Sequence, residues 1–157
     1  MSTIAAGTSA GSGLVHTSDT SGSLVFQTNN NVTALSMDTS GNATFPGNMT
    51  LSGYTEGLAT ASTGTAFAID VATSTVKVLT LTGNCTFTFP TLVAGKSFTL
   101  LLKQDATGGR TVTWPATVKW PAATAPTITA TANRTDKYTF VCDGSFWLGS
   151  SAGQNYA

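Results

Sequence analysis

Between Val76 and Leu148 the chain alternates apolar and polar residues in short runs that are separated by turn-forming residues. Alternation with a period of two is typical of strands that bury one face, and no window of about 11 residues places apolar residues at helical spacing. Four prolines stand at the ends of runs, where a missing backbone donor costs least. The pattern predicts an all-β fold. We expect a β-sandwich or jelly-roll-like C-terminal domain of about eight short strands, preceded by an extended, strand-rich N-terminal arm.

One predicted hairpin has the dipeptide Asp143-Gly144 as its two-residue turn, because both residues tolerate a positive φ. Both faces of this hairpin would be apolar, which is typical of two strands in the centre of a sheet. The predicted cross-strand pairs are Phe140 with Trp147 and Val141 with Phe146.

Two further hairpins are predicted upstream. Gly83-Asn84 permits a two-residue loop, and the five-residue loop 105–109 would join a strand over 96–104 to one over 110–114. The first hairpin sets Val78 opposite Phe89 and Thr80 opposite Phe87, with Val78, Phe87 and Phe89 on one face. The second places Phe98, Leu100 and Leu102 on the same face as Val112 and Trp114. The predicted core residues are Phe87, Phe89, Phe98, Leu100, Leu102, Val112, Phe140 and Phe146.

Shorter alternating runs at 67–71, 118–120 and 127–130 complete the predicted domain. Upstream, 24–28 and 32–37 are strand-like, and the loop 39–41 with Gly41 in the left-handed position would set Leu35 opposite Phe45. The first 58 residues hold too few large apolar side chains for a core of their own, so we expect copies of the chain to supply the missing contacts. The predicted domains are an extended, oligomerising arm over 1–58 that docks on a partner and a β-sandwich knob over 59–157.

Charge and composition narrow the classes of function. Only 9% of the residues are charged, and 31 threonines supply hydroxyl groups and a preference for strands. Residues 1–76 carry four acids and no base, whereas the remainder carries seven bases and three acids. This asymmetry is either a chance result in a charge-poor chain or an aid to docking. The bases are scattered, so no nucleic-acid interface is predicted. No apolar stretch is long enough to span a membrane, and the start lacks the features of a secretory signal.

The sequence predicts neither an enzyme nor a cofactor or metal site. His16 has no cysteine or carboxylate cluster beside it, and the seven carboxylates are dispersed. Cys85 and Cys142 are expected to be buried thiols rather than a disulfide. Two Trp-Pro dipeptides place indoles at strand ends. Trp114 is assigned to the core, and Trp120 is the candidate for stacking on a sugar ring.

Several segments resemble a β-domain found at the C-terminal ends of tailed-phage structural and tail-fibre-like proteins. The resemblance is carried by TGGRTVTWP and DGSFW within the stretch from KVLTLTGNCTFTFP to DKYTFVCDGSFWLG. The opening, AGTSAGSGLVHTSDTSGSLVFQTNNNVTALSMDTSGNATFPG, is similar to the repetitive lead-in segment that precedes such domains. The resemblance implies a virion protein that is commonly a homotrimer and uses no cofactor.

These observations predict a bacteriophage virion surface protein that is made and assembled in the host cytoplasm. No virion-anchoring domain is recognised ahead of the lead-in, which favours a capsid decoration or head-fibre protein. A short tail fibre or tail adaptor protein is the first alternative, and a carbohydrate-binding module for host attachment is the second. The expected partners are copies of the chain, other capsid or tail proteins, and a host-surface glycan. The arm residues expected to dock are Ile4, Leu14, Val15, Leu24, Val25 and Phe26.

Overall fold

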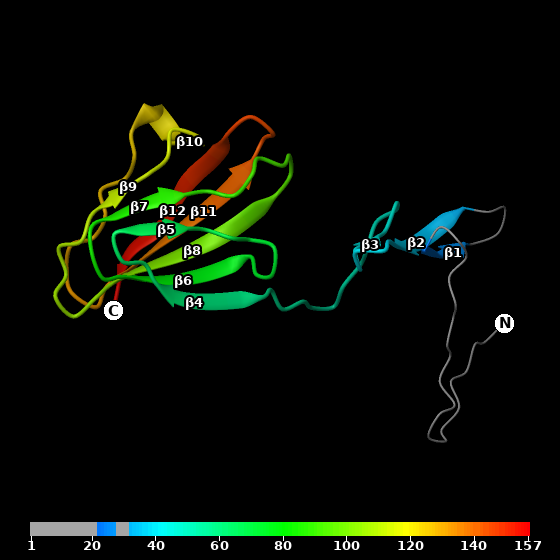
Figure 1. Cartoon of the computed structure of the whole chain (residues 1–157), viewed down its shortest axis with the longest axis horizontal. Helices are drawn as coiled ribbons and strands as arrows, with labels where there is room; N and C mark the ends of the chain where they lie inside the picture. Colours follow the sequence, from blue (N-terminus) through cyan, green and yellow to red (C-terminus); the bar gives the residue numbers. More distant parts are fainter. Residues whose placement is uncertain (1–21, 28–31) are drawn as a thin grey trace, which may run out of the picture. The chain divides into compact units, whose positions relative to one another are not determined.

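The computed structural model describes residues 22–27 and 32–157. The chain divides into an N-terminal unit, residues 1–54, and a sandwich unit, residues 55–157. In the described ranges its regular secondary structure is strand apart from one 3₁₀ turn (Figure 1), which confirms the all-β prediction.

The sandwich unit contains one six-stranded and one three-stranded sheet. The six-stranded sheet has the order β10-β12-β11-β8-β6-β4, and the three-stranded sheet has the order β5-β7-β9. Their inner faces enclose a single hydrophobic core. The strands of the large sheet are β4 (Leu58–Ser62), β6 (Val76–Leu81), β8 (Ser97–Gln104), β10 (Val118–Lys119), β11 (Thr135–Cys142) and β12 (Trp147–Tyr156). Those of the small sheet are β5 (Ala66–Ala68), β7 (Cys85–Thr88) and β9 (Val112–Thr113).

From β4 to β9 the chain winds as a parallel coil. Successive strands alternate between the two sheets, and each strand lies parallel to the one two places earlier. Three turns of coil result, namely β4–β5, β6–β7 and β8–β9. After the coil, β11 pairs antiparallel with β8, and β12 pairs antiparallel with β11.

The hairpin predicted at Gly83-Asn84 is wrong, because these residues turn the chain from one sheet to the other. The Asn84 side-chain oxygen accepts a hydrogen bond from the Thr111 backbone N–H at 3.0 Å, which links this corner to the next turn of coil. Strand β6 directs Leu79 and Leu81 into the core, and Val78 faces outward. The predicted pairs Val78 with Phe89 and Thr80 with Phe87 therefore do not form.

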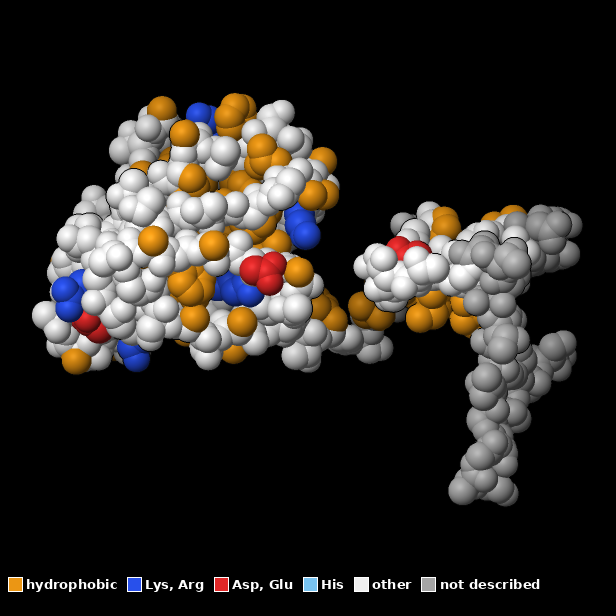
Figure 2. Space-filling view, viewed as in Figure 1, with side chains coloured by type: hydrophobic (Ala, Val, Ile, Leu, Met, Phe, Trp, Pro, Cys, Tyr) orange, Lys and Arg blue, Asp and Glu red, His pale blue; other side chains and the backbone are white. Residues whose placement is uncertain are grey.

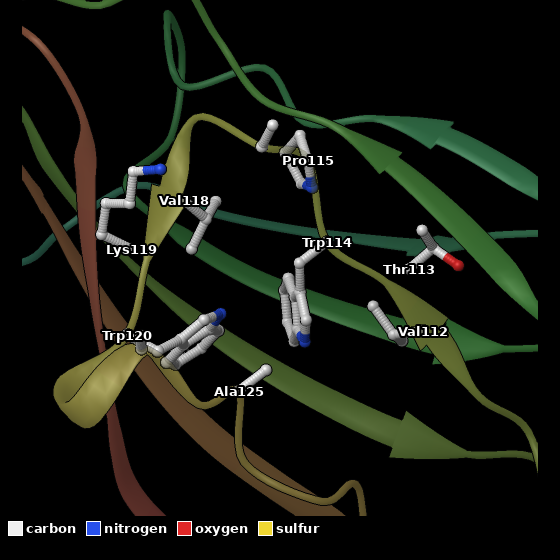
Figure 3. Close-up of a pocket in the computed structure, with 10 residues that line it drawn as sticks. Val112, Thr113, Trp114, Pro115, Val118, Lys119, Trp120 and Ala125 are labelled. Atoms are coloured by element: carbon white, nitrogen blue, oxygen red, sulfur yellow. The ribbon is translucent and has the colours of Figure 1, made fainter.

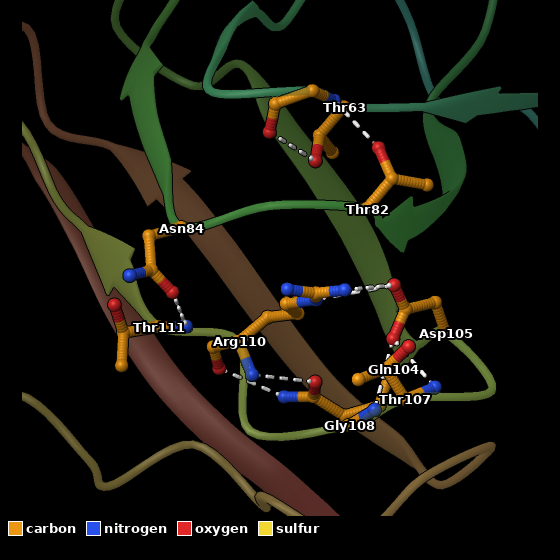
Figure 4. A network of polar contacts seen from close by, with 10 residues as sticks. Thr63, Thr82, Asn84, Gln104, Asp105, Thr107, Gly108, Arg110 and Thr111 are labelled. Atoms are coloured by element: carbon orange, nitrogen blue, oxygen red, sulfur yellow. Dashed lines mark hydrogen bonds and ion pairs between the residues drawn. The ribbon is translucent and has the colours of Figure 1, made fainter.

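The loop 105–109 is also a corner rather than a hairpin, since β8 and β9 lie in different sheets. The Asp105 carboxylate shapes it by accepting hydrogen bonds from the backbone N–H groups of Thr107 and Gly108 and from the Arg110 guanidinium (Figure 4). The predicted core side chains nevertheless meet, because the two strands face each other across the sandwich. The buried residues are Phe98, Leu100 and Leu102, and Val112 and Trp114 pack against them.

Strands β11 and β12 form the hairpin predicted at Asp143-Gly144, but its loop is longer and comprises residues 143–146. The Asp143 carboxylate accepts hydrogen bonds from the backbone N–H groups of Ser145 and Phe146, both at 2.7 Å, which stabilises this loop. Cys142 is therefore paired with Trp147, and the register differs by two residues from the prediction. A shift of two keeps every side chain on its expected face. The outer face is exposed, however, and Phe146, predicted to be a core residue, is 40% exposed.

Aromatic side chains fill the wider part of the core. Phe98 and Phe140 stack with ring centroids 4.8 Å apart, and Phe89 meets Phe140 edge to face at 5.0 Å. The indole N–H of Trp147 donates to the Pro90 carbonyl at 3.2 Å. Through this cluster Phe89, which directly follows β7, packs against the large sheet.

Residues 127–130 were predicted to form a strand, but no strand forms there. Buried polar side chains hold this segment instead. Gln104 donates to the Thr129 carbonyl at 2.8 Å, and Asp136 accepts from the Thr129 N–H at 2.8 Å. Gln104 also exchanges two hydrogen bonds with the backbone of Arg110. The hydrogen bonds from these side chains replace those that a neighbouring strand would make.

The N-terminal unit contains a small antiparallel sheet of β1 (Leu24–Gln27), β2 (Thr33–Met37) and β3 (Ala43–Thr44). The predicted hairpin loop at 39–41 is confirmed, with Gly41 at φ 80° and with the register that sets Leu35 opposite Phe45. The Asp38 carboxylate stabilises it by accepting hydrogen bonds from the N–H groups of Ser40 and Asn42 at 2.9 and 2.8 Å.

Candidate functional site

The described residues contain no group of three or more His, Cys, Asp and Glu side chains that could hold a metal ion. Cys85 and Cys142 are free, buried thiols, as predicted. His16 lies outside the described ranges. Within those ranges, no helix has the length and apolar character needed to cross a membrane.

A hollow of the sandwich unit lies beside the two Trp-Pro dipeptides, between β9, β10 and the 3₁₀ turn Pro121–Ala123. It has a volume of about 630 Å³ and is lined by Trp114, Trp120 and Val118, with Lys119 at its rim (Figure 3). The prolines account for the local structure. Pro115 follows β9 and Pro121 opens the 3₁₀ turn, so each indole is held at a strand end.

Trp120 is half-buried and packs against three aromatic rings of the core. Its ring centroid lies 5.2 Å from that of Trp114, 5.8 Å from Tyr138 and 5.6 Å from Phe140. Gly149 leaves the space that the indole occupies, since a Cβ there would lie 2.8 Å from Cζ3 of Trp120. Trp114 belongs to the core, as predicted.

The Trp120 indole N–H is the one buried side-chain polar atom without a hydrogen-bond partner among the described residues. On another side, Trp120 borders a second hollow of about 300 Å³ with Pro126 and the hydroxyl-bearing residues Thr124, Ser150 and Ser151. An aromatic ring beside several hydroxyl groups offers both apolar contact and hydrogen bonding to a ligand. Stacking of a sugar on Trp120 stays a prediction.

Of the predicted docking residues, Ile4, Leu14 and Val15 lie outside the described ranges. The other three lie together on β1. Leu24 is half-buried, and Val25 and Phe26 are 45% and 44% exposed. The sequence reasoning missed further exposed apolar residues of this unit, which stand singly between polar residues, Gly or Pro. They are Val32, Met37, Phe45, Met49, Leu51 and Tyr54 (Figure 2).

The outer face of the large sheet carries another exposed apolar group near the β11–β12 loop. Val141 and Leu148 are cross-strand partners and are 49% and 47% exposed. Lys119 pairs with Leu148 in the register and places its ammonium 4.6 Å from the centre of the Phe146 ring. The hairpin pattern placed these apolar residues on one face but gave no indication that the face would be open.

Three charged side chains of the sandwich unit, Asp105, Arg110 and Asp136, have structural roles. Asp105 and Arg110 form the single ion pair in the described part of the chain, at 2.8 Å. The hydrogen bond from Arg110 and those from two backbone N–H groups lower the pKa of Asp105. Burial alone would raise the pKa of Asp136, but hydrogen bonds from Thr129, Asn155 and Tyr138 outweigh it and lower this pKa.

Comparison with protein families gives a match to the family described as "Putative phage tail fibre C-terminal domain", over residues 63–147. The match covers more than half of the chain and most of the sandwich unit, without β4 and nearly all of β12. Comparisons with curated proteins and with solved structures gave no match. The chain therefore belongs to the phage tail fibre C-terminal domain family and is a structural component of a phage virion.

Proposed function

We propose that this virion protein is a fibre subunit of the phage tail, in which the N-terminal unit joins and docks the copies and the sandwich unit forms an outward knob. The observation that carries the proposal is the contrast between the two units. The sandwich unit encloses its own core, whereas the described part of the N-terminal unit leaves most of its large apolar side chains exposed.

The exposed apolar residues of the N-terminal unit support a homo-oligomer. A sheet of three short strands is marginal in water unless it packs against something else. Val25 and Phe26 of β1 and Phe45 after β3 are each 44 to 45% exposed, so copies of the unit can bury them against one another. We propose a homotrimer, the assembly expected from the resemblance to fibre proteins.

A capsid decoration or head-fibre protein is the alternative position on the particle. The family description favours the tail. Electron microscopy of intact particles with a gold label on the C-terminus distinguishes the two. Gold at the tail supports the proposal, and gold distributed over the head overturns it in favour of a head fibre.

Binding of a host-surface glycan is a second proposed function, supported by the hollow formed by Trp120, Thr124, Ser150 and Ser151. The test is an array of bacterial surface glycans probed with the full chain. The double variant Ser150→Ala/Ser151→Ala should lose binding while its core stays intact, because both side chains are exposed. A variant that binds as well as the wild type, or a wild type that binds no glycan, contradicts this function.

A further inference from the structure

The parallel coil has an open end at its first turn. Strands β4 and β5 are edge strands of the large and small sheets, and both belong to this turn. The side chains that β4 directs inward are only those of Ala59 and Ala61, which lie beside Lys77 and Leu79 of β6 in the register. Leu58 at the start of β4 is 61% exposed. Within the described residues, no further strand covers this end of the core.

Strand β4 presents unpaired backbone groups at this end. The Gly57 carbonyl accepts a hydrogen bond from the Val76 N–H, and the Thr63 N–H donates one to the Thr80 carbonyl, both at 3.0 Å. The backbone N–H and C=O groups of the odd-numbered residues between them therefore point toward β6. In a parallel ladder the backbone groups of Leu58, Thr60 and Ser62 then point to the open side. The sequence LATAS has no charge and no proline, the usual features that protect an edge strand. The edge is therefore competent to pair with another strand.

A cavity beneath the edge contains a buried positive charge. Its volume is about 90 Å³, and its lining includes Ala59, Ala61, Phe67 and Lys77. Lys77 is 6% exposed, and its ammonium donates to the hydroxyl of Ser74. Asp70 lines the same cavity, but no ion pair joins it to Lys77 in the described part of the chain. A buried ammonium without a carboxylate partner is costly, so this end is complementary to an acidic side chain.

We propose that the open end accepts an extended segment of a neighbouring particle protein, which adds a strand to β4. In the added strand, the residue beside Ala59 has a carboxylate side chain that is directed toward Lys77. The residue two positions away, beside Ala61, has an aliphatic side chain that fills the cavity. Main-chain hydrogen bonds supply affinity, and the alternate side chains supply selectivity. The inference rests on the proposed function, because it requires the protein to assemble with others in a particle.

The first test compares Thr60→Pro with Thr60→Ala in the full chain, each supplied to particles that lack the native copy. Proline removes the N–H that points to the open side and is tolerated at a sheet edge, whereas alanine keeps the N–H. We expect about tenfold fewer incorporated copies for Thr60→Pro, the effect of losing one or two backbone hydrogen bonds, and normal incorporation for Thr60→Ala. Equal incorporation of both variants overturns the proposal. Thr60→Lys, which protects the edge by charge, serves the same purpose if the proline variant does not fold.

The second test identifies the donor strand. Carbodiimide treatment of wild-type particles should join the Lys77 ammonium to an Asp or Glu of another particle protein, and mass spectrometry would locate the link. Lys77→Met should abolish this link, and Lys103→Met, on the outer face, should not. A link that reaches only Asp70 or Glu56 of this chain, or a second copy of it, overturns the proposal. Particles that incorporate no wild-type protein instead contradict the proposed function itself.

Discussion

At the scale of single residues, buried polar side chains make the hydrogen bonds to the backbone that a neighbouring strand makes elsewhere. Asp136 is 1% exposed and accepts hydrogen bonds from the backbone of Thr129 and Asn155 and from the Tyr138 hydroxyl. It thereby fixes both the irregular segment 127–130 and the end of β12. Burial and the neighbouring Asp136 carboxylate raise the pKa of Tyr138, which keeps this phenol a hydrogen-bond donor at any physiological pH.

The lowered pKa of Asp136 predicts a loss of stability in acid. Because the folded state holds this pKa below the unfolded value of about 3.9, the contribution is complete above that value and is lost as pH falls through the folded pKa. We expect Asp136→Asn to cost about 1.5–3 kcal/mol at pH 7, the range for hydrogen bonds to charged groups. Urea denaturation of both proteins between pH 7 and pH 3 should show a smaller fall for the variant. A parallel fall in both would contradict this role.

Gly149 is predicted to be essential for the position of Trp120. An added Cβ would lie 2.8 Å from Trp120 Cζ3 and 2.9 Å from Phe140 Cε1, so the indole must move. Gly149→Ala should cost about 1–3 kcal/mol, as overpacking of a core does. Thermal denaturation and tryptophan fluorescence would measure the effect. Gly53→Ala is the matched control, because nothing lies within 4 Å of its added Cβ. A Gly149→Ala protein as stable as the control would disprove the packing of Trp120.

At the scale of elements, the face on which each residue lies was more predictable than the neighbour of each strand. The alternation of apolar residues correctly assigned Phe98, Leu100 and Leu102 to the core, because side-chain direction depends only on position along the strand. Gly83-Asn84 gives the same local signal in a hairpin and in a corner between sheets. Distant contacts distinguish them, namely the pairing of β6 and β7 with other strands and the hydrogen bond from Thr111 to Asn84, and the sequence does not reveal these contacts.

The candidate sites were predictable to a smaller extent. The two Trp-Pro dipeptides pointed to Trp114 and Trp120, whereas the hollow beside them depends on Gly149 and on the 3₁₀ turn at 121–123. Strand β6 reads as Val-Lys-Val-Leu-Thr-Leu, in which either face could be buried. An apolar Val78 in the core and a charged Lys77 outside would be expected, but the structure has Lys77 inward and Val78 outward. The sequence therefore gave no sign of the open end of the coil.

Substitution at the stacked pair Phe98 and Phe140 tests the core assignment. Both are almost fully buried, so Phe98→Ala should lower the free energy of unfolding by about 3–5 kcal/mol. Val141→Ala, on the exposed outer face of β11, should change it by less than about 0.5 kcal/mol. Chemical denaturation of the two variants would measure these losses. A loss below about 1 kcal/mol for Phe98→Ala would contradict the assignment.

At the scale of the whole molecule, the N-terminal unit should determine the oligomeric state. Sedimentation of the full chain should give a mass about three times 16.0 kDa. Val25→Ser/Phe26→Ser should shift the protein toward monomer, and Val141→Ser/Leu148→Ser, on the sandwich unit, should not. The association should persist in 1 M salt, because the first 76 residues contain no Lys or Arg and burial rather than charge stabilises it. A monomeric wild type would contradict the proposed trimer.

The same unit should attach the protein to the particle. Deleting residues 2–30 removes all six predicted docking residues and leaves the sandwich core intact, since its residues lie beyond residue 68. The deletion variant should retain its tryptophan fluorescence and its unfolding transition but fail to join particles that lack the native copy. Binding equal to that of the full chain would show that the sandwich unit is the docking element.

Because of the coil from β4 to β9, the two ends of the sandwich unit should differ in stability. Each turn of coil contacts only the turn before and the turn after it, as in repeat proteins, whose stability is a sum of nearest-neighbour terms. The β4–β5 turn has a neighbour on one side only, whereas the last turn is joined through β8 to the antiparallel β11 and β12. Unfolding should therefore begin by fraying at β4 and progress toward the hairpin. An added turn of coil at that end would lengthen the coil by one strand spacing, about 4.8 Å, without altering the packing beneath it.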